Sequence, residues 1–476
     1  MARQRWRRGL LAALLPIALT AGCVSYVEGT GQIGITVQGD SGGPFDTQVN
    51  NALSAVIAYW TAAYPAIAHG RPLPPLRGKY YSIDGTEVLR TRQVPANASD
   101  EKCLQLRLGF IIDNAAYCEL DDSIVWDRSP QHLLPVLSRA YGPAVTALVF
   151  AHEFGHAIQQ RLHVNTAVDR TIDVESQADC AAGAFAAAAL KGQLPQFKLT
   201  PAALDRALAG YLQIRDSTPN SPEDISHGDG FDRLNALQQG IQSGASYCFS
   251  STFMTNRTYT ERGYVSDQDY VDRGNQPLAE VLNPTGIVAD LNRFWATAAS
   301  KQGKTFRAVK FAKADHLPCG GLNPDSELGY CADDNTVYYS ASFAHRAYYS
   351  ITAPNVHAYT GDVSLSHREP GDFALGTLFA IAWGMAGEHQ LYGASTDGTD
   401  GLTTAVCYAG AYADDINRIT GDAAHPYILS PPDMDEATSA VLELVGSDRA
   451  FSARSTTGLQ RVQEFVKGYT DGLTGC

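Results

Sequence analysis

The chain has 476 residues, 45 % of them hydrophobic and 18 % charged, a composition typical of a folded protein with more than one domain and not of a disordered or coiled-coil chain. Its 36 basic and 50 acidic residues give a net charge of −14. We expect no nucleic-acid partner, because general nucleic-acid binders need cationic surface to displace counterions.

The N-terminus is typical of an export signal. Four arginines, the last at Arg8, precede an apolar stretch from Leu10 to Ala21. This stretch falls short of the roughly 20 residues that span a bilayer, so we interpret residues 1–22 as a signal peptide. It ends in Leu19-Thr20-Ala21-Gly22-Cys23, which resembles a bacterial lipobox and implies cleavage before Cys23 and lipidation of that residue. The alternative is a plain secretory signal with an incidental cysteine.

Cleavage there would remove four arginines and no acid, changing the net charge from −14 to −18. Residues 23–45 are rich in glycine, and we expect them to form a flexible stalk below the lipid anchor. We find no later segment long and apolar enough to span a membrane. These features predict localisation at the extracytoplasmic face of a bacterial cell membrane, with the membrane contacted through the N-terminal lipid.

The central motif is His152-Glu153-Phe154-Gly155-His156, an H-E-x-x-H sequence. Residues i and i+4 share one helix face, so both histidines can reach one metal ion, while Glu153 can approach a metal-bound water as general base. The motif requires a helix, which we expect over residues 144–160 after Gly142-Pro143.

A third ligand is needed, because catalytic zinc sites keep three protein ligands and a water. We expect a second helix over residues 171–190, which carries Glu175 and Asp179 one turn apart. Glu175 is the candidate third ligand. Asp179 could accept a hydrogen bond from a ligand histidine and fix its tautomer. The alternative is that both acids form a solvated helix face.

These residues resemble the family of bacterial putative neutral zinc metallopeptidases. The resemblance spans about residues 57–248 and rests on the H-E-x-x-H motif with Gln159, on Glu175-x-Gln177-Ala178-Asp179-Cys180-x-Ala182-Gly183, and on Ser226-His227-Gly228 followed by Arg233 and Cys248. It implies a zincin-like α+β domain that binds one zinc ion through His152, His156 and Glu175. Peptides or proteins are then the implied substrates.

Two further site features are hypotheses. His227 lies beyond the third ligand and next to a glycine, and we take it as the candidate donor to the oxyanion, with a surface-loop histidine as the alternative. In zincin architecture an extended peptide pairs with an edge strand, and we assign that strand to residues 123–127.

The cysteines indicate an internal repeat. After Cys23, eight cysteines fall into two sets of four with similar spacings, and the sequence around them repeats. We interpret this as a tandem duplication: a metallopeptidase-like domain at 46–250, a linker at 251–284, and a second domain at 285–476. Pairing within each copy is the simplest scheme, although four cysteines allow three connectivities. It gives the disulfides Cys103–Cys118, Cys180–Cys248, Cys319–Cys331 and Cys407–Cys476.

The second copy lacks the candidate site. Aligning the repeated phenylalanines, glycines, cysteines and arginines places apolar or small residues at every candidate position. The second copy has Ile381, Ala382, Met385, Leu402, Val406 and Ser455 at the positions that match, in the same order, His152, Glu153, His156, Glu175, Asp179 and His227. We therefore expect an α+β protein with two tandem zincin-like domains, the second degenerate, whose partner the sequence does not identify.

The sequence thus favours a membrane-anchored extracytoplasmic zinc metallopeptidase, a hydrolase that cleaves peptide bonds with a zinc-activated water. The alternative is a non-catalytic binding lipoprotein with a structural or vestigial metal site. An intact Glu153 favours the enzyme, because a structural site needs no general base. Hydrolysis of a non-peptide amide is a third possibility.

Overall fold

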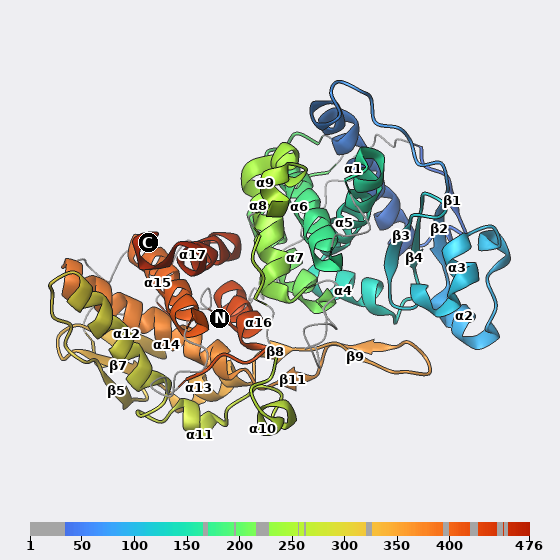
Figure 1. The fold of residues 1–476 in the computed structure, drawn as a ribbon. Helices are drawn as coiled ribbons and strands as arrows, with labels where there is room; N and C mark the ends of the chain where they lie inside the picture. The colour runs from blue at the N-terminus through green and yellow to red at the C-terminus, as the bar shows by residue number, and fades with distance from the viewer. Residues whose placement is uncertain are drawn as a thin grey trace, which may run out of the picture.

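In the computed structural model the described residues are 34–164, 170–194, 197–215, 228–255, 257–260, 263–319, 326–393, 399–418, 427–444, 451 and 456–476. The chain forms two α+β halves joined by a segment of short helices (Figure 1). Within this described part, no helix combines the length and apolar character that a bilayer crossing requires. The signal sequence and Cys23 lie outside the described residues.

The first half contains a four-stranded sheet and a layer of helices. Its strands are β1 (Val37–Gln38), β2 (Tyr80–Ile83), β3 (Ala115–Cys118) and β4 (Ser123–Asp127). Its helices are α1 (Pro44–Ile67), α2 (Gly85–Thr91), α3 (Lys102–Leu106), α4 (Leu133–Tyr141), α5 (Pro143–Leu162), α6 (Thr171–Leu190), α7 (Pro201–Tyr211) and α8 (Gly230–Cys248).

The sheet order is β1-β2-β4-β3, with β3 antiparallel to β4 and the other pairs parallel. This order corrects the assignment of the edge strand to residues 123–127. That segment is β4, it pairs on both sides, and all five of its residues are buried. The edge strand beside the helices is β3. Because a strand that is buried on both faces reads as a continuous apolar run, Ile124 to Trp126 belong to a central strand.

The stalk expectation is also wrong for its last residues. Val37 and Gln38 pair with Tyr80 and Tyr81 as an edge of the sheet, and α1 begins at Pro44. Proline at the first helical position has the required φ and lacks an N–H that would remain unpaired. The folded part of the chain therefore begins before residue 45.

The second half has a three-stranded sheet of order β5-β7-β6, again with one parallel and one antiparallel pair. A two-stranded antiparallel ribbon follows in the chain, in which β8 pairs with β11 and, farther along, β9 pairs with β10. The strands are β5 (Lys310–Lys313), β6 (Leu328–Cys331), β7 (Thr336–Tyr339), β8 (Ile351–Thr352), β9 (Asn355–Val356), β10 (Val363–Ser364) and β11 (Arg368–Glu369). The helices are α12 (Ile287–Lys301), α13 (Ala341–Tyr348), α14 (Asp372–Gly387), α15 (Thr399–Arg418), α16 (Asp433–Ser439) and α17 (Gly458–Asp471).

The segment between the halves carries three short helices, α9 (Ser251–Thr255), α10 (Asp267–Val271) and α11 (Leu278–Val281). It is packed against both halves. The Thr260 hydroxyl donates to Asp232 at 3.1 Å, and the Ser430 hydroxyl donates to Asp269 at 2.8 Å. The described residues of the linker expected at 251–284 are thus part of the packed fold.

Glycines let pairs of helices approach closely in both halves. A Cβ on Gly183 of α6 would overlap the carbonyl of Leu237 in α8, and a Cβ on Gly240 would overlap that of Cys180. In the second half, Gly410 and Gly468 are related in the same way to Phe465 and Cys407. The first pair is also joined by the disulfide Cys180–Cys248, and in the second half Cys407 of α15 is bonded to Cys476, shortly after the end of α17. The four disulfides of the structure are Cys103–Cys118, Cys180–Cys248, Cys319–Cys331 and Cys407–Cys476.

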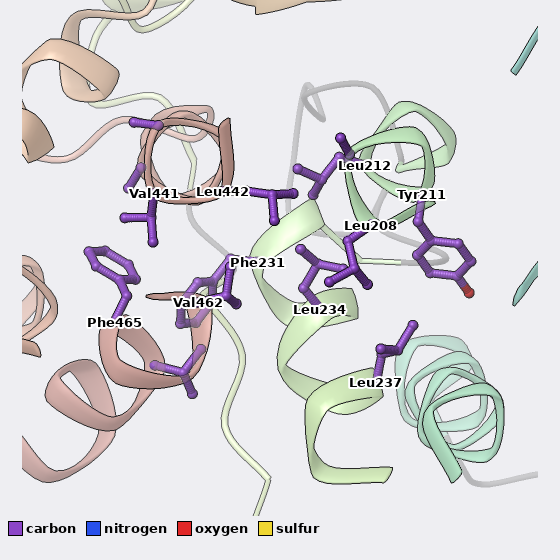
Figure 2. Close-up of a cluster of buried hydrophobic side chains, with 14 of the residues drawn as sticks. Leu208, Tyr211, Leu212, Phe231, Leu234, Leu237, Val441, Leu442, Val462 and Phe465 are labelled. Atoms are coloured by element: carbon purple, nitrogen blue, oxygen red, sulfur yellow. The ribbon is translucent and has the colours of Figure 1, made fainter. Parts of the chain in front are cut away.

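The halves meet through α7 and α8 on one side and α16 and α17 on the other. Figure 2 shows the apolar cluster between them, with Leu234 of α8 and Val462 of α17 near its centre. Hydrogen bonds at the helix ends are exchanged across this interface. Asp435 of α16 accepts from the N–H of Phe231 at 3.1 Å, and Asp205 of α7 accepts from the N–H of Gly458 at 2.7 Å.

The β9-β10 hairpin reaches from the second half to the first (Figure 1). The N–H of Val363 donates to the carbonyl of Gln131 at 2.8 Å, and the carbonyl of Thr360 lies 2.9 Å from Nε2 of His132. His132 is fully buried, and its Nδ1 is hydrogen-bonded to Asp127. The hairpin therefore contacts the first half beyond the end of β4.

Candidate active site

Two adjacent helices position the candidate ligands. Helix α5 begins after Gly142, whose φ of +90° suits glycine, and residues 152–156 begin at its middle. Helix α6 is rich in alanine and packs against α5 where a Cβ on Gly155 would lie 3.0 Å from Cα of Ala178. The absence of a side chain at Gly155 thus lets the two helices approach and brings Glu175 to the histidines.

The three candidate ligand atoms converge. Nε2 of His152 lies 3.1 Å from Nε2 of His156 and 3.1 Å from Oε2 of Glu175. Nε2 of His156 lies 3.5 Å from the same carboxylate oxygen. Potential ligand atoms of these three residues lie within 4.8 Å of one another. The structure therefore brings together the three residues that the sequence analysis assigned to the metal.

The opposite nitrogen of each imidazole has an acceptor as its partner. Nδ1 of His152 lies 2.7 Å from Oδ1 of Asp179, and Nδ1 of His156 lies 2.8 Å from Oε1 of Gln159. The Gln159 amide is oriented by its own Nε2, which donates to the carbonyl of Val174 at 2.7 Å. Each Nδ1 must therefore carry the proton, and in a neutral imidazole Nε2 then presents a lone pair.

Two lone-pair nitrogens and a carboxylate oxygen that face one another repel unless a cation or a proton lies between them. Two imidazoles and one carboxylate form a typical donor set of catalytic zinc sites. The residues thus fit a zinc ion on the chemistry of their donors. A cleft of about 310 Å³, lined in part by His156, Gln159 and Glu175, opens at this group.

The ionisation of the group without a metal follows the same contacts. Burial lowers the pKa of His152, but the charge and hydrogen bond of Asp179 outweigh it and raise this pKa to about 10. Burial raises the pKa of Asp179, but the charges of Arg233 and His152 lower it to about 2. The pKa of Glu175 is held well below its usual value by the two histidines, against the opposing effect of burial.

Asp179 is held by residues that the sequence analysis did not assign to the site. The guanidinium of Arg233 donates to Asp179 at 3.1 Å from Nε and at 3.0 Å from Nη2. The hydroxyl of Tyr211 also hydrogen-bonds Asp179, and the Arg233 guanidinium lies 4.7 Å from the Tyr211 ring centroid. Arg233 entered the sequence analysis through the family resemblance and the internal repeat, without a role in the site, so its contact with Asp179 was missed.

The arginine at the matching position of the second half has different partners. Arg461 donates to the carbonyls of Val441 and Leu442, each at 2.8 Å, and Val406 stands at the position of Asp179. Arg233 likewise donates to a backbone carbonyl, that of Ile214, at 2.7 Å. The shared role of the arginine is to hold the preceding backbone, and its contact with the carboxylate occurs only in the first half.

Glu153 lies beside the ligands and contacts the edge strand. Its Oε2 accepts a hydrogen bond from the backbone N–H of Tyr117 in β3 at 2.8 Å, and its Oε1 lies 4.0 Å from Nε2 of His152. The second oxygen therefore remains near the ligand group. His227, the candidate oxyanion donor, lies outside the described residues.

The positions in the second half that match the ligands hold buried apolar side chains. Ile381, Ala382 and Met385 are buried in α14, and Leu402 and Val406 are buried in α15. These positions belong to a continuous apolar core, and a metal ion would find no ligand among them.

Comparison with known protein families gives one match in agreement with this geometry. Residues 112–253, under a third of the chain, match the model of a family described as putative neutral zinc metallopeptidase. The matched region includes β3, β4, α5, α6 and α8, and therefore every site residue described above. No curated protein and no solved structure gives a significant match.

Proposed function

We propose that the first half of the chain is a zinc-dependent peptidase. The observation that carries the proposal is the convergence of Nε2 of His152, Nε2 of His156 and Oε2 of Glu175, with each imidazole oriented from behind by an acceptor. The match of residues 112–253 to a zinc metallopeptidase family supports the same reaction class.

The chain's own groups have distinct roles in this reaction. His152, His156 and Glu175 would hold the zinc ion, which when bound would lower the pKa of a water and polarise the substrate carbonyl. Glu153 takes the proton from the attacking water and later passes it to the leaving amine. The N–H of Tyr117 holds one oxygen of Glu153, which leaves the other to accept the proton. Asp179 and Gln159 keep Nδ1 of each histidine protonated and so fix the tautomer.

The substrate pairs with β3 in this proposal. This strand has a sheet partner on one side only among the described residues, and its Tyr117 side chain lines the cleft beside the ligands. An extended peptide could therefore add to this edge and bring its backbone past Glu153.

The second half is, in our proposal, a degenerate copy of the first that retains its scaffold. Three relations support this: the two sheets share one strand arrangement, equivalent glycines make equivalent helix contacts, and Asp205 and Asp435 exchange helix caps. We further propose that the domains at 46–250 and 285–476 are tethered through lipidated Cys23 at the extracytoplasmic face of the membrane. That part rests on the sequence alone.

Zinc content and peptide hydrolysis test the proposal together. We expect one zinc per chain in the wild type and in Glu153→Gln, and none in His156→Ala. Of these three proteins, only the wild type should hydrolyse a mixed peptide library. His345→Ala, in an exposed position of the second half, is the control and should resemble the wild type. Full hydrolysis by Glu153→Gln would refute the mechanism, and zinc without any hydrolysis would favour a binding protein with a structural metal.

A further inference from the structure

A second, larger pocket adjoins the metal cleft. It has a volume of about 570 Å³, and Gln160 and His163 line both spaces. Its walls come from α1, from the end of α5 and from the proline-rich loop of residues 71–77. Volumes of this order are typical of ligand pockets. Nothing in the proposed reaction accounts for it.

Arg161 builds the wall of this pocket and is not itself available to a ligand. Its side chain is 7 % exposed, and it donates to the carbonyls of Pro74 and Pro75 at 2.9 and 3.0 Å. It also donates to Asp122 at 3.0 Å. The negative charge of Asp122 is therefore compensated by Arg161. The same guanidinium holds the loop of residues 71–77 in place through the carbonyls of Pro74 and Pro75.

Two further arginines line the pocket, and neighbouring groups compensate little of their positive charge. Arg77 is 76 % exposed, and its one ion pair places Nε 3.4 Å from Asp122. Arg71 donates from Nε to the carbonyl of Ala68 at 3.1 Å. Among the described residues, the terminal nitrogens of both guanidinium groups have no hydrogen-bond or ion-pair partner. Two positive charges thus face one pocket in a chain whose net charge is −14.

The distance between the metal ligands and the pocket determines which residue of a bound peptide would reach the pocket. His156 and His163 lie seven residues apart along α5, which corresponds to about 10 Å at 1.5 Å per residue. An extended peptide covers about 10 Å in three residues. Glu119 lines the metal cleft but not the pocket, so the position next to the cleaved bond has an acid beside it.

From this arrangement we infer that the pocket binds a carboxylate of the peptide substrate, an acidic side chain about three residues from the scissile bond. A guanidinium binds a carboxylate with two parallel hydrogen bonds, which makes the arginine pair suited to this group. The inference rests on the proposed peptidase function and adds a preference for acidic peptides to it.

The test separates binding from cleavage. Zinc-loaded full-length Glu153→Gln would be titrated with fluorescent extended peptides that carry one glutamate at successive positions, and with matched glutamine peptides. We expect at least tenfold tighter binding for glutamate at one position about three residues from the centre, and a smaller difference at high salt. Arg71→Ala/Arg77→Ala should reduce the difference to less than threefold, whereas Arg139→Ala, in an exposed position of α4, should retain it.

Three outcomes would overturn the inference. The first is equal binding of glutamate and glutamine peptides. The second is a preference for glutamate peptides that persists in Arg71→Ala/Arg77→Ala. The third is no detectable binding of either peptide. The proposed function is judged separately, by wild-type cleavage of the same peptides. Cleavage without a preference for acidic peptides would refute the carboxylate pocket but not the peptidase function. A binding preference without cleavage would refute the peptidase function but not the binding of a carboxylate in the pocket.

Discussion

The carboxylate of Asp435 accepts a hydrogen bond from the backbone N–H of Phe231, 204 residues earlier in the chain. This contact adds an acceptor from the other half to the first turn of α8, which Asp229 already caps at the N–H of Asp232. The same carboxylate pairs with Arg215, at 2.7 Å from its Nε. Because α8 also carries Arg233, which holds Asp179, the second half is linked through one helix to a residue behind the metal ligands.

Asp435→Ala should lower the free energy of unfolding by about 1–3 kcal/mol, because it removes a helix cap and the partner of Arg215. It should also weaken zinc binding, since the first turn of α8 loses its hydrogen bond to the other half and keeps only the cap from Asp229. Denaturant titration and zinc competition would measure the two effects. Asp205→Ala removes the equivalent cap from α17 and is the matched control. It should reduce stability without a change in zinc affinity, and equal zinc affinities in both variants would contradict the link.

Asp179→Asn should weaken zinc binding about 10–100-fold, the usual cost of losing the group that orients a ligand histidine. It should also destabilise the protein by about 3 kcal/mol or more, because the buried Arg233 loses its counter-charge. Asp173→Asn on the same helix is the control, since Asp173 pairs with the exposed Arg170. That variant should change stability by less than about 1 kcal/mol and leave zinc affinity intact. The prediction fails if the two variants bind zinc alike.

His132 should make stability depend on pH. Burial lowers its pKa, but the hydrogen bond and charge of Asp127, with a smaller contribution from Asp113, raise it to about 9. A raised pKa stabilises the fold fully below the unfolded value of about 6.5, and this contribution is lost as the pH rises through about 9. Urea midpoints at pH 6, 7.5 and 9 should therefore fall more steeply in the wild type than in His132→Gln. Parallel profiles would refute the assignment.

Gly183→Ala should destabilise the first half by about 1–3 kcal/mol, because its Cβ would overlap the carbonyl of Leu237 and force α6 and α8 apart. Gly410→Ala should have a similar effect in the second half, where the obstructing carbonyl is that of Phe465. Gly109→Ala meets no atom within 4 Å and should stay within about 0.5 kcal/mol of the wild type. Thermal unfolding of the three variants would provide the comparison, and an undisturbed Gly183→Ala would contradict the tight crossing.

The sequence was most informative where the interaction is local. The i, i+4 spacing of His152 and His156 and the proline at Pro143 depend on one helix, and the structure has that helix at Pro143–Leu162. Glu175 could be chosen because its distance along the chain suited the next helix. The expected α+β class agrees with the mixture of helices and sheets.

The features that were missed depend on packing between distant segments. Strand order cannot be derived from β4 alone, because its central position results from β2, about 40 residues earlier, pairing with its other edge. The two-residue strand β1 leaves no alternating pattern to recognise. Tyr211 and Arg233 reach Asp179 from separate helices, and the pattern around Arg233 did not indicate a site because the second half retains an arginine at Arg461.

The capping of α8 by Asp435 also has a consequence for the order of folding. A chain is synthesised from its N-terminus, so the H-E-x-x-H helix and all three metal ligands exist long before α16 does. Until about residue 435 has emerged, the first turn of α8 has only the cap that Asp229 provides, the N–H of Phe231 lacks its acceptor, and Arg215 lacks its carboxylate partner. A nascent first half would therefore remain less stable than the finished protein. Completion of the whole chain would then act as a checkpoint for the maturation of its metal centre.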